Sequence, residues 1–162
     1  MALTESTMLE LGASAPAFTL DDVTSGKSVS LDAVTKDKGV LVLFICSHCP
    51  YVVHIHNALG ELSRDYADQP VGIVGICSND PVASPRDSVE NLQAQVREQG
   101  FTFPYLLDRT QEVAKAYKAA CTPDLFLFDG DKKLVYRGQF DGSRPGNDVP
   151  VTGADLRAAL DA

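Results

Sequence analysis

An apolar run that leads straight into two cysteines constrains the fold of this chain more than any other feature. Residues 40–45 read Val-Leu-Val-Leu-Phe-Ile, and the sequence continues as Cys-Ser-His-Cys-Pro. The run lacks alternation, so it predicts a central strand that is buried on both faces. Apolar residues then recur at every third or fourth position, which predicts a helix over residues 47–66. The sequence therefore places a Cys-x-x-Cys pair where a strand passes into a helix.

This position favours dithiol–disulfide chemistry. A thiol near a helix N-terminus ionises easily, because unpaired backbone N–H groups and the helix dipole stabilise the thiolate. We expect Cys46, as the outer and more accessible cysteine, to attack a disulfide. Cys49, one turn further along, would then resolve the mixed disulfide. A protonated His48 between them would favour the Cys46 thiolate and make the disulfide more oxidising.

A Cys/His metal-binding module is an alternative, because all three histidines follow the first cysteine closely. His54 and His56 are two residues apart and would point to opposite sides of a helix. His56 lies two turns beyond Cys49, about 10 Å along the axis, which is too far for one shared ion. A tetrahedral site would need a ligand from elsewhere, with Cys121 as the best candidate. We therefore expect no metal and no other cofactor.

The rest of the chain predicts an α/β architecture. A second apolar run, residues 71–77, follows the helix, and a strand–helix–strand unit implies parallel neighbours. Helices are expected over residues 88–99, from Asp108 to about residue 120, and from Thr152 onward. Short strands are expected at 17–20, 28–31, 101–107, 125–128 and 133–138, the last two as a hairpin. The pattern predicts one domain over residues 1–162, with 1–16 as a mobile lead-in.

Charge and cysteine content narrow the functional classes. The formal net charge of −8 argues against nucleic acid or an anionic membrane as partner. Residues 1–11 contain no basic residue and no long apolar run, so no secretory signal is predicted and a cytoplasmic location is expected. Four cysteines are too few for a disulfide scaffold. Cys77, at the end of an apolar run, is interpreted as a small buried side chain.

The turn Cys121-Thr122-Pro123 comes after a helix and before the predicted hairpin. Together with the strand, the Cys-x-x-Cys pair and the following helix, this order resembles the thioredoxin fold. Further motifs resemble the peroxiredoxin-like branch of that superfamily, which is related to alkyl hydroperoxide reductases and thiol-specific antioxidants. They are the Leu11-Gly12…Ala15-Pro16…Phe18 lead-in, Phe44–Val52, Cys121–Asp124, Leu134–Gly138 and Ser143–Asn147. The resemblance implies a mixed central sheet flanked by helices on both faces, an N-terminal extension and an inserted helix.

The resemblance also implies roles for single residues. Pro123 would be the cis-proline that lies against the active-site cysteines, with Thr122–Pro123 as the cis bond. Cys121 would then lie close to Cys46, either as a third reactive thiol or as a small buried residue, and both readings stay open. Members of this branch often carry a longer C-terminal tail with another cysteine, so the sequence is also compatible with a truncated tail.

The chain departs from both family patterns. Residues 40–45 contain no carboxylate, whereas thioredoxins place a buried acid on this strand. Cys46 takes the place of the peroxiredoxin threonine, and Cys49-Pro50 matches the peroxidatic Cys-Pro. No arginine stands near residues 121–122 to polarise a peroxide, so Arg137 or Arg144 could serve only if the fold brings it close.

We therefore predict a thiol–disulfide oxidoreductase that cycles a Cys46–Cys49 disulfide. Its substrates would be protein or small-molecule disulfides and thiols, with a reducing thiol system to complete the cycle. The first alternative is a peroxiredoxin-like antioxidant peroxidase that uses Cys49 on hydroperoxides. The second is the metal-binding module. The physiological partner and the oligomeric state are not predicted.

Overall fold

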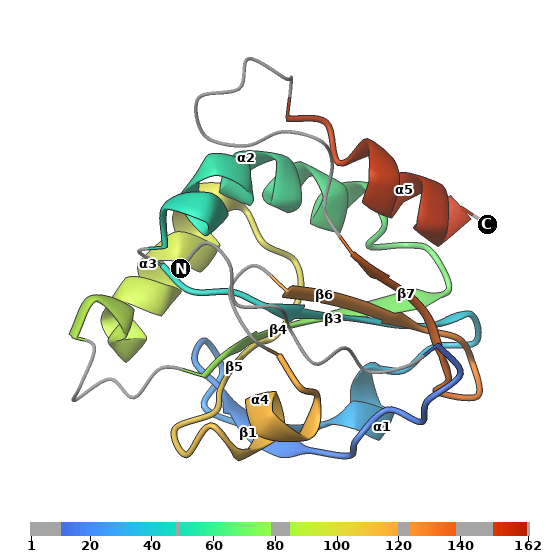
Figure 1. Ribbon diagram of the computed structural model, residues 1–162. Coiled ribbons are helices and arrows are strands. Elements are labelled where there is room, and N and C mark those ends of the chain that lie inside the picture. Colours follow the sequence, from blue (N-terminus) through green and yellow to red (C-terminus); the bar gives the residue numbers. More distant parts are fainter. Residues whose placement is uncertain (1–10, 48, 79–84, 120–123, 139–150, 162) are drawn as a thin grey trace.

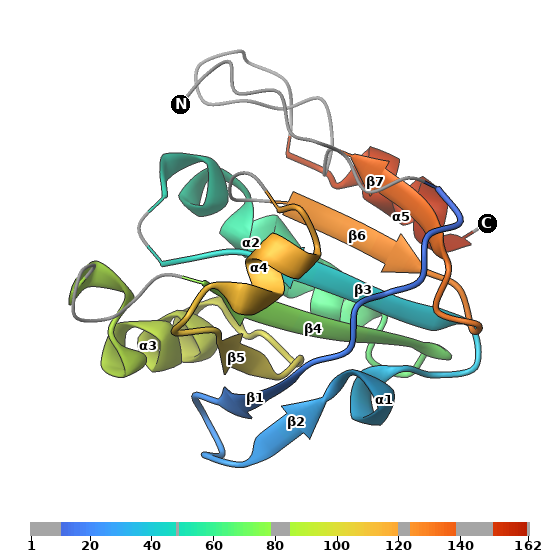
Figure 2. The ribbon, with the colours of Figure 1, turned by 60° about the horizontal axis from the view of Figure 1, so that its bottom comes forward.

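The computed structural model describes residues 11–47, 49–78, 85–119, 124–138 and 151–161. Within these ranges the centre of the molecule is one mixed sheet, whose strands follow the order β2-β1-β5-β4-β3-β6-β7 (Figure 2). The strands are β1 (Thr19–Asp22), β2 (Ser28–Ser30), β3 (Gly39–Phe44), β4 (Val71–Cys77), β5 (Tyr105–Leu107), β6 (Asp124–Phe128) and β7 (Leu134–Gly138). β3 therefore lies between a parallel neighbour, β4, and an antiparallel one, β6.

The helices cover both faces of this sheet, as Figure 1 shows with the sheet seen edge-on. They are α1 (Leu31–Val34), α2 (Pro50–Asp65), α3 (Val89–Gln99), α4 (Glu112–Ala116) and α5 (Ala154–Asp161), with a 3-10 turn η1 (Pro85–Asp87) before α3. α2, α3 and α5 lie on one face, and α1 and α4 lie on the other. The mixed sheet flanked by helices on both faces confirms the expected fold class.

Two apolar layers separate the sheet from its helices. The alternate residues Leu41, Leu43 and Ile45 face the layer beneath α2, α3 and α5. Val40, Val42 and Phe44 face the layer beneath α1 and α4, where Tyr117 lies. All six residues of β3 are buried, which confirms the prediction of a central strand. The cysteine pair thus follows a strand that is buried along its whole length.

Element boundaries differ from the sequence expectations where proline or side-chain capping decides them. The helix expected over 47–66 begins at Pro50, because Cys49 is extended (φ −62°, ψ 126°) and serves as its N-cap. The helix expected from Asp108 is shorter: Gln111 adopts a left-handed conformation and α4 begins at Glu112. α1 was not expected from the sequence; the Ser30 hydroxyl caps it by accepting a bond from the Ala33 N–H.

Among the helices of the described ranges, none combines the length and the apolar character that a membrane crossing requires.

Candidate active site

Both cysteines of the Cys-x-x-Cys pair lie in the turn between β3 and α2. The backbone N–H of Cys49 donates a hydrogen bond to the Cys46 Sγ, with 3.3 Å between nitrogen and sulfur. This N–H belongs to the N-cap of α2, so the Cys46 sulfur sits among the backbone donors at the start of that helix. A donor of this kind stabilises a negative charge on sulfur more than a neutral thiol. The geometry therefore favours the thiolate form of Cys46.

The two cysteines differ in exposure, and the difference is opposite to the sequence expectation. Cys46 is 1% exposed, whereas Cys49 is only partly buried. The expectation that Cys46 is the more accessible cysteine is therefore wrong. The reason is that the chain stays inside the molecule beyond β3: the Ile45 N–H bonds to the Ile76 carbonyl, and the Gln95 amide donates to the Cys46 carbonyl at 3.1 Å. A parallel neighbour strand and α3 hold Cys46 inward.

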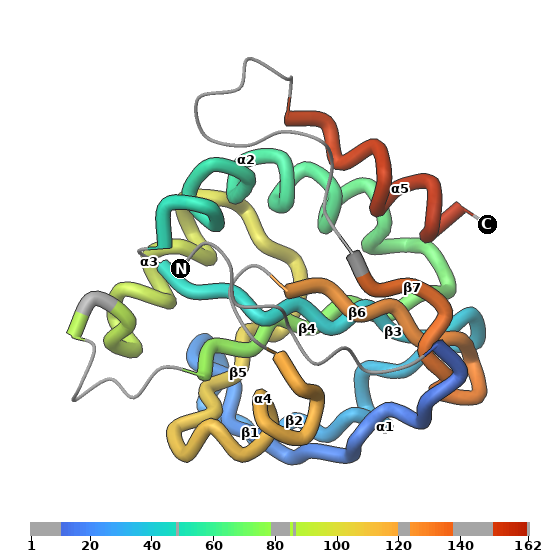
Figure 3. Tube along the Cα trace, in the orientation of Figure 1, coloured from blue at the N-terminus to red at the C-terminus, as the bar shows by residue number. Residues whose placement is uncertain are grey.

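A buried carboxylate adjoins the same turn. Asp87, the last residue of η1, has no exposed surface, and one of its oxygens, Oδ1, accepts two hydrogen bonds from Ser47. They come from the Ser47 N–H at 2.9 Å and the Ser47 hydroxyl at 2.8 Å. Figure 3 shows the chain leaving β3 near the segment that carries η1 and α3. Asp87 was not identified from the sequence, because nothing local distinguishes it from the residue after it, Ser88, which caps α3.

Two further titratable side chains lie behind the turn. Cys77, at the end of β4, is fully buried, which confirms its interpretation as a buried side chain. Tyr105 of β5 is also fully buried, and among the described residues its hydroxyl has no hydrogen-bond partner. Burial first, and then the neighbouring charges of Cys77, Cys46 and Asp87, hold the pKa of the Tyr105 hydroxyl well above its ordinary value of 10. Tyr105 therefore stays protonated throughout the neutral range.

Several predicted site residues fall outside the described ranges. His48, Cys121, Thr122, Pro123 and Arg144 belong to this group. The redox-tuning role of His48, the cis bond before Pro123 and the third thiol at Cys121 therefore stay predictions. The structure does place the next residue: Asp124 of β6 pairs in register with Phe44, two residues before Cys46.

Arg137 does not lie where a peroxide-polarising arginine would have to lie. Its guanidinium binds the Asp124 carboxylate at 2.9 Å and donates to the Lys118 carbonyl at 3.1 Å. It also stacks over the Phe126 ring, 4.6 Å from the ring centre, and Phe126 belongs to the layer beneath α1 and α4. Cys46 packs in the opposite layer. Arg137 is thus occupied on the other face of the sheet.

The described part of the chain gives the metal alternative little support. It contains no group of three or more His, Cys, Asp or Glu side chains placed to share a metal ion. Both His54 and His56 lie on α2, two residues apart, as the sequence indicated. Burial lowers the pKa of the His56 imidazole below its ordinary value of 6.5, and the nearby charge of Glu98 only partly opposes this effect.

The lowered pKa of His56 predicts a loss of stability in mild acid. The unfolded chain takes up a proton near pH 6.5, before the folded chain does, so the free energy of unfolding falls as the pH drops through that value. Above pH 6.5 both forms are neutral and the contribution vanishes. Urea unfolding at about pH 7.5 and about pH 5.5 should show a smaller acid loss for His56→Gln than for the wild type. An equal loss in both proteins would contradict the prediction.

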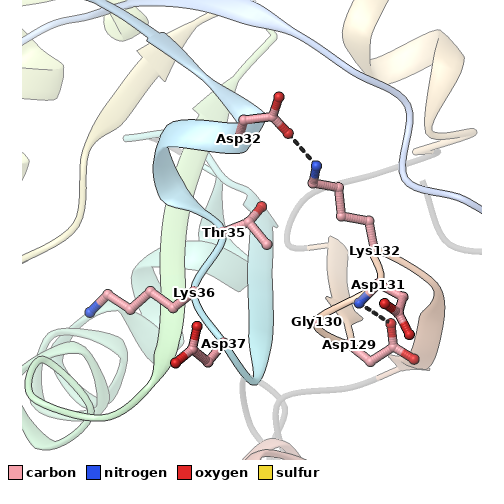
Figure 4. A pocket seen from close by; sticks show the side chains of 8 residues that line it. All are labelled: Asp32, Thr35, Lys36, Asp37, Asp129, Gly130, Asp131 and Lys132. Atoms are coloured by element: carbon pink, nitrogen blue, oxygen red, sulfur yellow. Dashed lines mark hydrogen bonds and ion pairs between the residues drawn. The ribbon is translucent and has the colours of Figure 1, made fainter.

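Two surface hollows lie away from the cysteines. A hollow of about 700 Å³ is formed by residues after α1 and by the β6–β7 turn, at the opposite end of β3 (Figure 4). Asp32 and Lys132 form an ion pair across it, and Asp37, Asp129 and Asp131 also line it. A second hollow, of about 650 Å³, lies between residues 19–26 and 107–110 beside α3. Neither hollow is lined by a cysteine.

Comparisons with known proteins agree with this geometry. The family model described as Redoxin matches residues 10–156. The thiol-disulfide oxidoreductase ResA of Geobacillus kaustophilus is 31% identical over 137 residues, which are 83% of this chain and 74% of the relative.

Two solved structures resemble the whole described fold. An uncharacterized conserved protein from Geobacillus kaustophilus is 52% identical with a TM-score of 0.94, over 98% of this chain and 84% of the other. The thioredoxin domain of a thiol-disulfide oxidoreductase from Bacteroides vulgatus is 25% identical with a TM-score of 0.68, over 93% of this chain and 98% of the other. The thioredoxin-like fold expected from the sequence is thereby confirmed.

Proposed function

The chain belongs to the Redoxin family and is a thiol–disulfide oxidoreductase, and we propose that it works by cycling Cys46 and Cys49 between dithiol and disulfide. The observation that carries this proposal is the hydrogen bond from the Cys49 N–H to the Cys46 Sγ. This bond links the backbone of Cys49 to the side chain of Cys46, and it supplies a hydrogen-bond donor that stabilises a thiolate on Cys46. On sequence grounds we also propose that the cycle operates in the cytoplasm.

The proposed reaction has two exchange steps. The Cys46 thiolate attacks one sulfur of a partner disulfide, so a Cys46–partner bond forms, the partner S–S bond breaks, and the released sulfur takes up a proton. The Cys49 thiolate then attacks the Cys46 sulfur, which forms the Cys46–Cys49 disulfide and releases the second partner thiol. Two electrons pass to the partner, and a reducing dithiol must return them to complete the cycle. The same steps in reverse oxidise a partner dithiol.

Burial determines how a substrate reaches Cys46 and what surrounds its sulfur. The Cys46 residue is 1% exposed, so little of its surface is available to an incoming disulfide. This enclosure excludes bulk water and strengthens the interaction of the thiolate with the Cys49 N–H. Cys49, which is more exposed, stays in contact with the same sulfur and can complete the second step without a large movement.

A glutathione redox titration tests the proposal directly. The full chain is equilibrated with reduced and oxidised glutathione at set ratios, the remaining thiols are alkylated, and peptide mapping locates the disulfide. We expect one reversible transition that joins Cys46 to Cys49, and we expect the reduced protein to catalyse insulin reduction. Cys77→Ser serves as the matched control, because Cys77 is buried outside the turn. A pair that never forms a disulfide would overturn the proposal.

A peroxidase that uses Cys49 is the second candidate, and one observation favours it. Cys49 is the more exposed cysteine, at the N-cap of α2, where a small peroxide could reach it. Arg137 does not supply the arginine that a peroxidase would use to polarise a peroxide, because its guanidinium binds the Asp124 carboxylate and the Lys118 carbonyl. Hydroperoxide consumption that survives Cys46→Ser but not Cys49→Ser would establish this activity instead.

A further inference from the structure

We infer that Asp87 is a positioning residue for the redox pair, which holds the cysteine turn through Ser47 and opposes thiolate formation at Cys46 with its charge. The inference rests on the proposed dithiol cycle and adds the group that sets the balance between its two redox forms. β3 itself supplies no carboxylate. The acid at this site comes instead from a segment about forty residues further along the chain.

The geometry of Ser47 shows how Asp87 acts on the turn. Ser47 follows Cys46 directly, and both its N–H and its hydroxyl donate to the same oxygen of Asp87, at 2.9 and 2.8 Å. Two bonds to one oxygen fix the Cys46–Ser47 peptide relative to η1. The Gln95 amide holds the other side of that peptide by donating to the Cys46 carbonyl. With the peptide fixed, the Cys49 N–H meets the Cys46 sulfur at 3.3 Å.

The charge of Asp87 acts on Cys46 because both residues are enclosed. Asp87 has no exposed surface and Cys46 is 1% exposed, so little water screens the two groups from each other. Among the described residues, Cys77 from β4 and Tyr105 from β5 also face this region. Tyr105 stays protonated at neutral pH and contributes no opposing charge. The Asp87 carboxylate, bound to the next residue Ser47, and the Cys49 N–H therefore have opposite effects on the charge of the Cys46 sulfur.

Removing the charge should change two measured quantities together. Asp87→Asn keeps an oxygen that can accept from Ser47 but carries no negative charge. The pH at which Cys46 reaches half of its maximal alkylation rate should fall by about one unit. The reduced form should become more stable relative to the disulfide. The equilibrium with glutathione should therefore move about tenfold toward the dithiol, which corresponds to about 30 mV for a two-electron couple.

Two further variants separate this role from a purely structural one. Ser47→Ala keeps the carboxylate and its charge but removes one of the two bonds that position the turn, so the Cys49 N–H should stabilise the Cys46 sulfur less well and both quantities should shift by a smaller amount in the opposite direction. If Asp87→Asn does not fold, Ser47→Ala alone tests the inference. Asp108→Asn is the matched control: Asp108 is 1% exposed and accepts from the Ser78 hydroxyl at 2.8 Å and the Ala114 N–H at 3.1 Å, and neither bond involves the cysteine turn.

The outcomes distinguish this inference from the proposed function. If wild-type protein forms no reversible Cys46–Cys49 disulfide, the proposed function fails whatever Asp87 does. If the disulfide forms and titrates normally, but neither Asp87→Asn nor Ser47→Ala moves the alkylation profile or the glutathione equilibrium beyond Asp108→Asn, then Asp87 is structural only and the inference is wrong. A shift of both quantities in the direction stated for each variant supports it.

Discussion

Cys46→Ser is expected to abolish the disulfide reductase activity, reducing turnover of insulin or a small disulfide to the rate without protein. A serine hydroxyl does not ionise near neutral pH, so it cannot use the Cys49 N–H that favours the Cys46 thiolate. Serine is also close to cysteine in size, so the packing of the turn should survive. The measurement is steady-state insulin reduction with a dithiol reductant, supported by unfolding curves that show an intact fold.

Cys49→Ser should separate the two steps of the same reaction. It leaves the attacking thiol in place but removes the second one, so the protein should stop at a mixed disulfide with its substrate. Mass spectrometry of the quenched reaction should find that substrate on Cys46. Cys77→Ser, which changes a buried thiol of β4, should keep most of the activity. Trapping of substrate on Cys49 in the Cys46→Ser protein would instead reverse the assignment of the two cysteines.

The parts of the fold that the sequence could predict are those with strong local signals. The apolar run 71–77 coincides with β4, and the run 40–45 differs from β3 by one residue at each end. α3 ends at Gln99 because its C-cap, Gly100, adopts a left-handed conformation (φ 65°), which glycine does at little cost. Such features depend on neighbouring residues, so they can be read along the chain.

The exposure of Cys46 could not be read in the same way. It depends on Gln95 and Asp87, which reach the turn from forty or more residues away. Local spacing indicated a helix start at residue 47, and on that basis the outer cysteine looked accessible. The true start at Pro50 leaves Cys46 in an extended stretch that continues the path of β3. The resemblance to thioredoxins pointed to a buried acid only on the strand 40–45, which has none, and no local signal indicated Asp87 in its place.

The face of the sheet on which Arg137 lies could have been predicted from the sequence of the hairpin. In a hairpin, residues opposite each other share one face of the sheet, and Arg137 pairs with Phe126 of the buried strand β6. That pairing places the arginine over an apolar face, where it needs a carboxylate partner. Asp124, two residues before Phe126 on β6, points to the same face and supplies it.

Among single substitutions in the ion pairs of the described residues, Arg137→Met should cause the largest loss of stability. The Arg137 and Asp124 side chains are 3% and 12% exposed and lie 2.9 Å apart, so removing the arginine leaves a buried carboxylate without its main counter-charge. Breaking such a pair from one side costs about 3–5 kcal/mol in the free energy of unfolding. The variant also loses the bond to the Lys118 carbonyl and the stacking on Phe126. Equilibrium unfolding in urea measures the loss.

The double variant Arg137→Met/Asp124→Asn tests the cause. Because the uncompensated charge is then gone, the double variant should be more stable than Arg137→Met alone, although both change the same hairpin. Lys132→Met is the matched control, since it breaks an exposed ion pair. The Lys132 side chain is 36% exposed, and that of its partner Asp32 is 80% exposed. An exposed pair contributes less than about 1 kcal/mol. Equal losses for Arg137→Met and Lys132→Met would show that burial does not determine the strength of the Arg137–Asp124 pair.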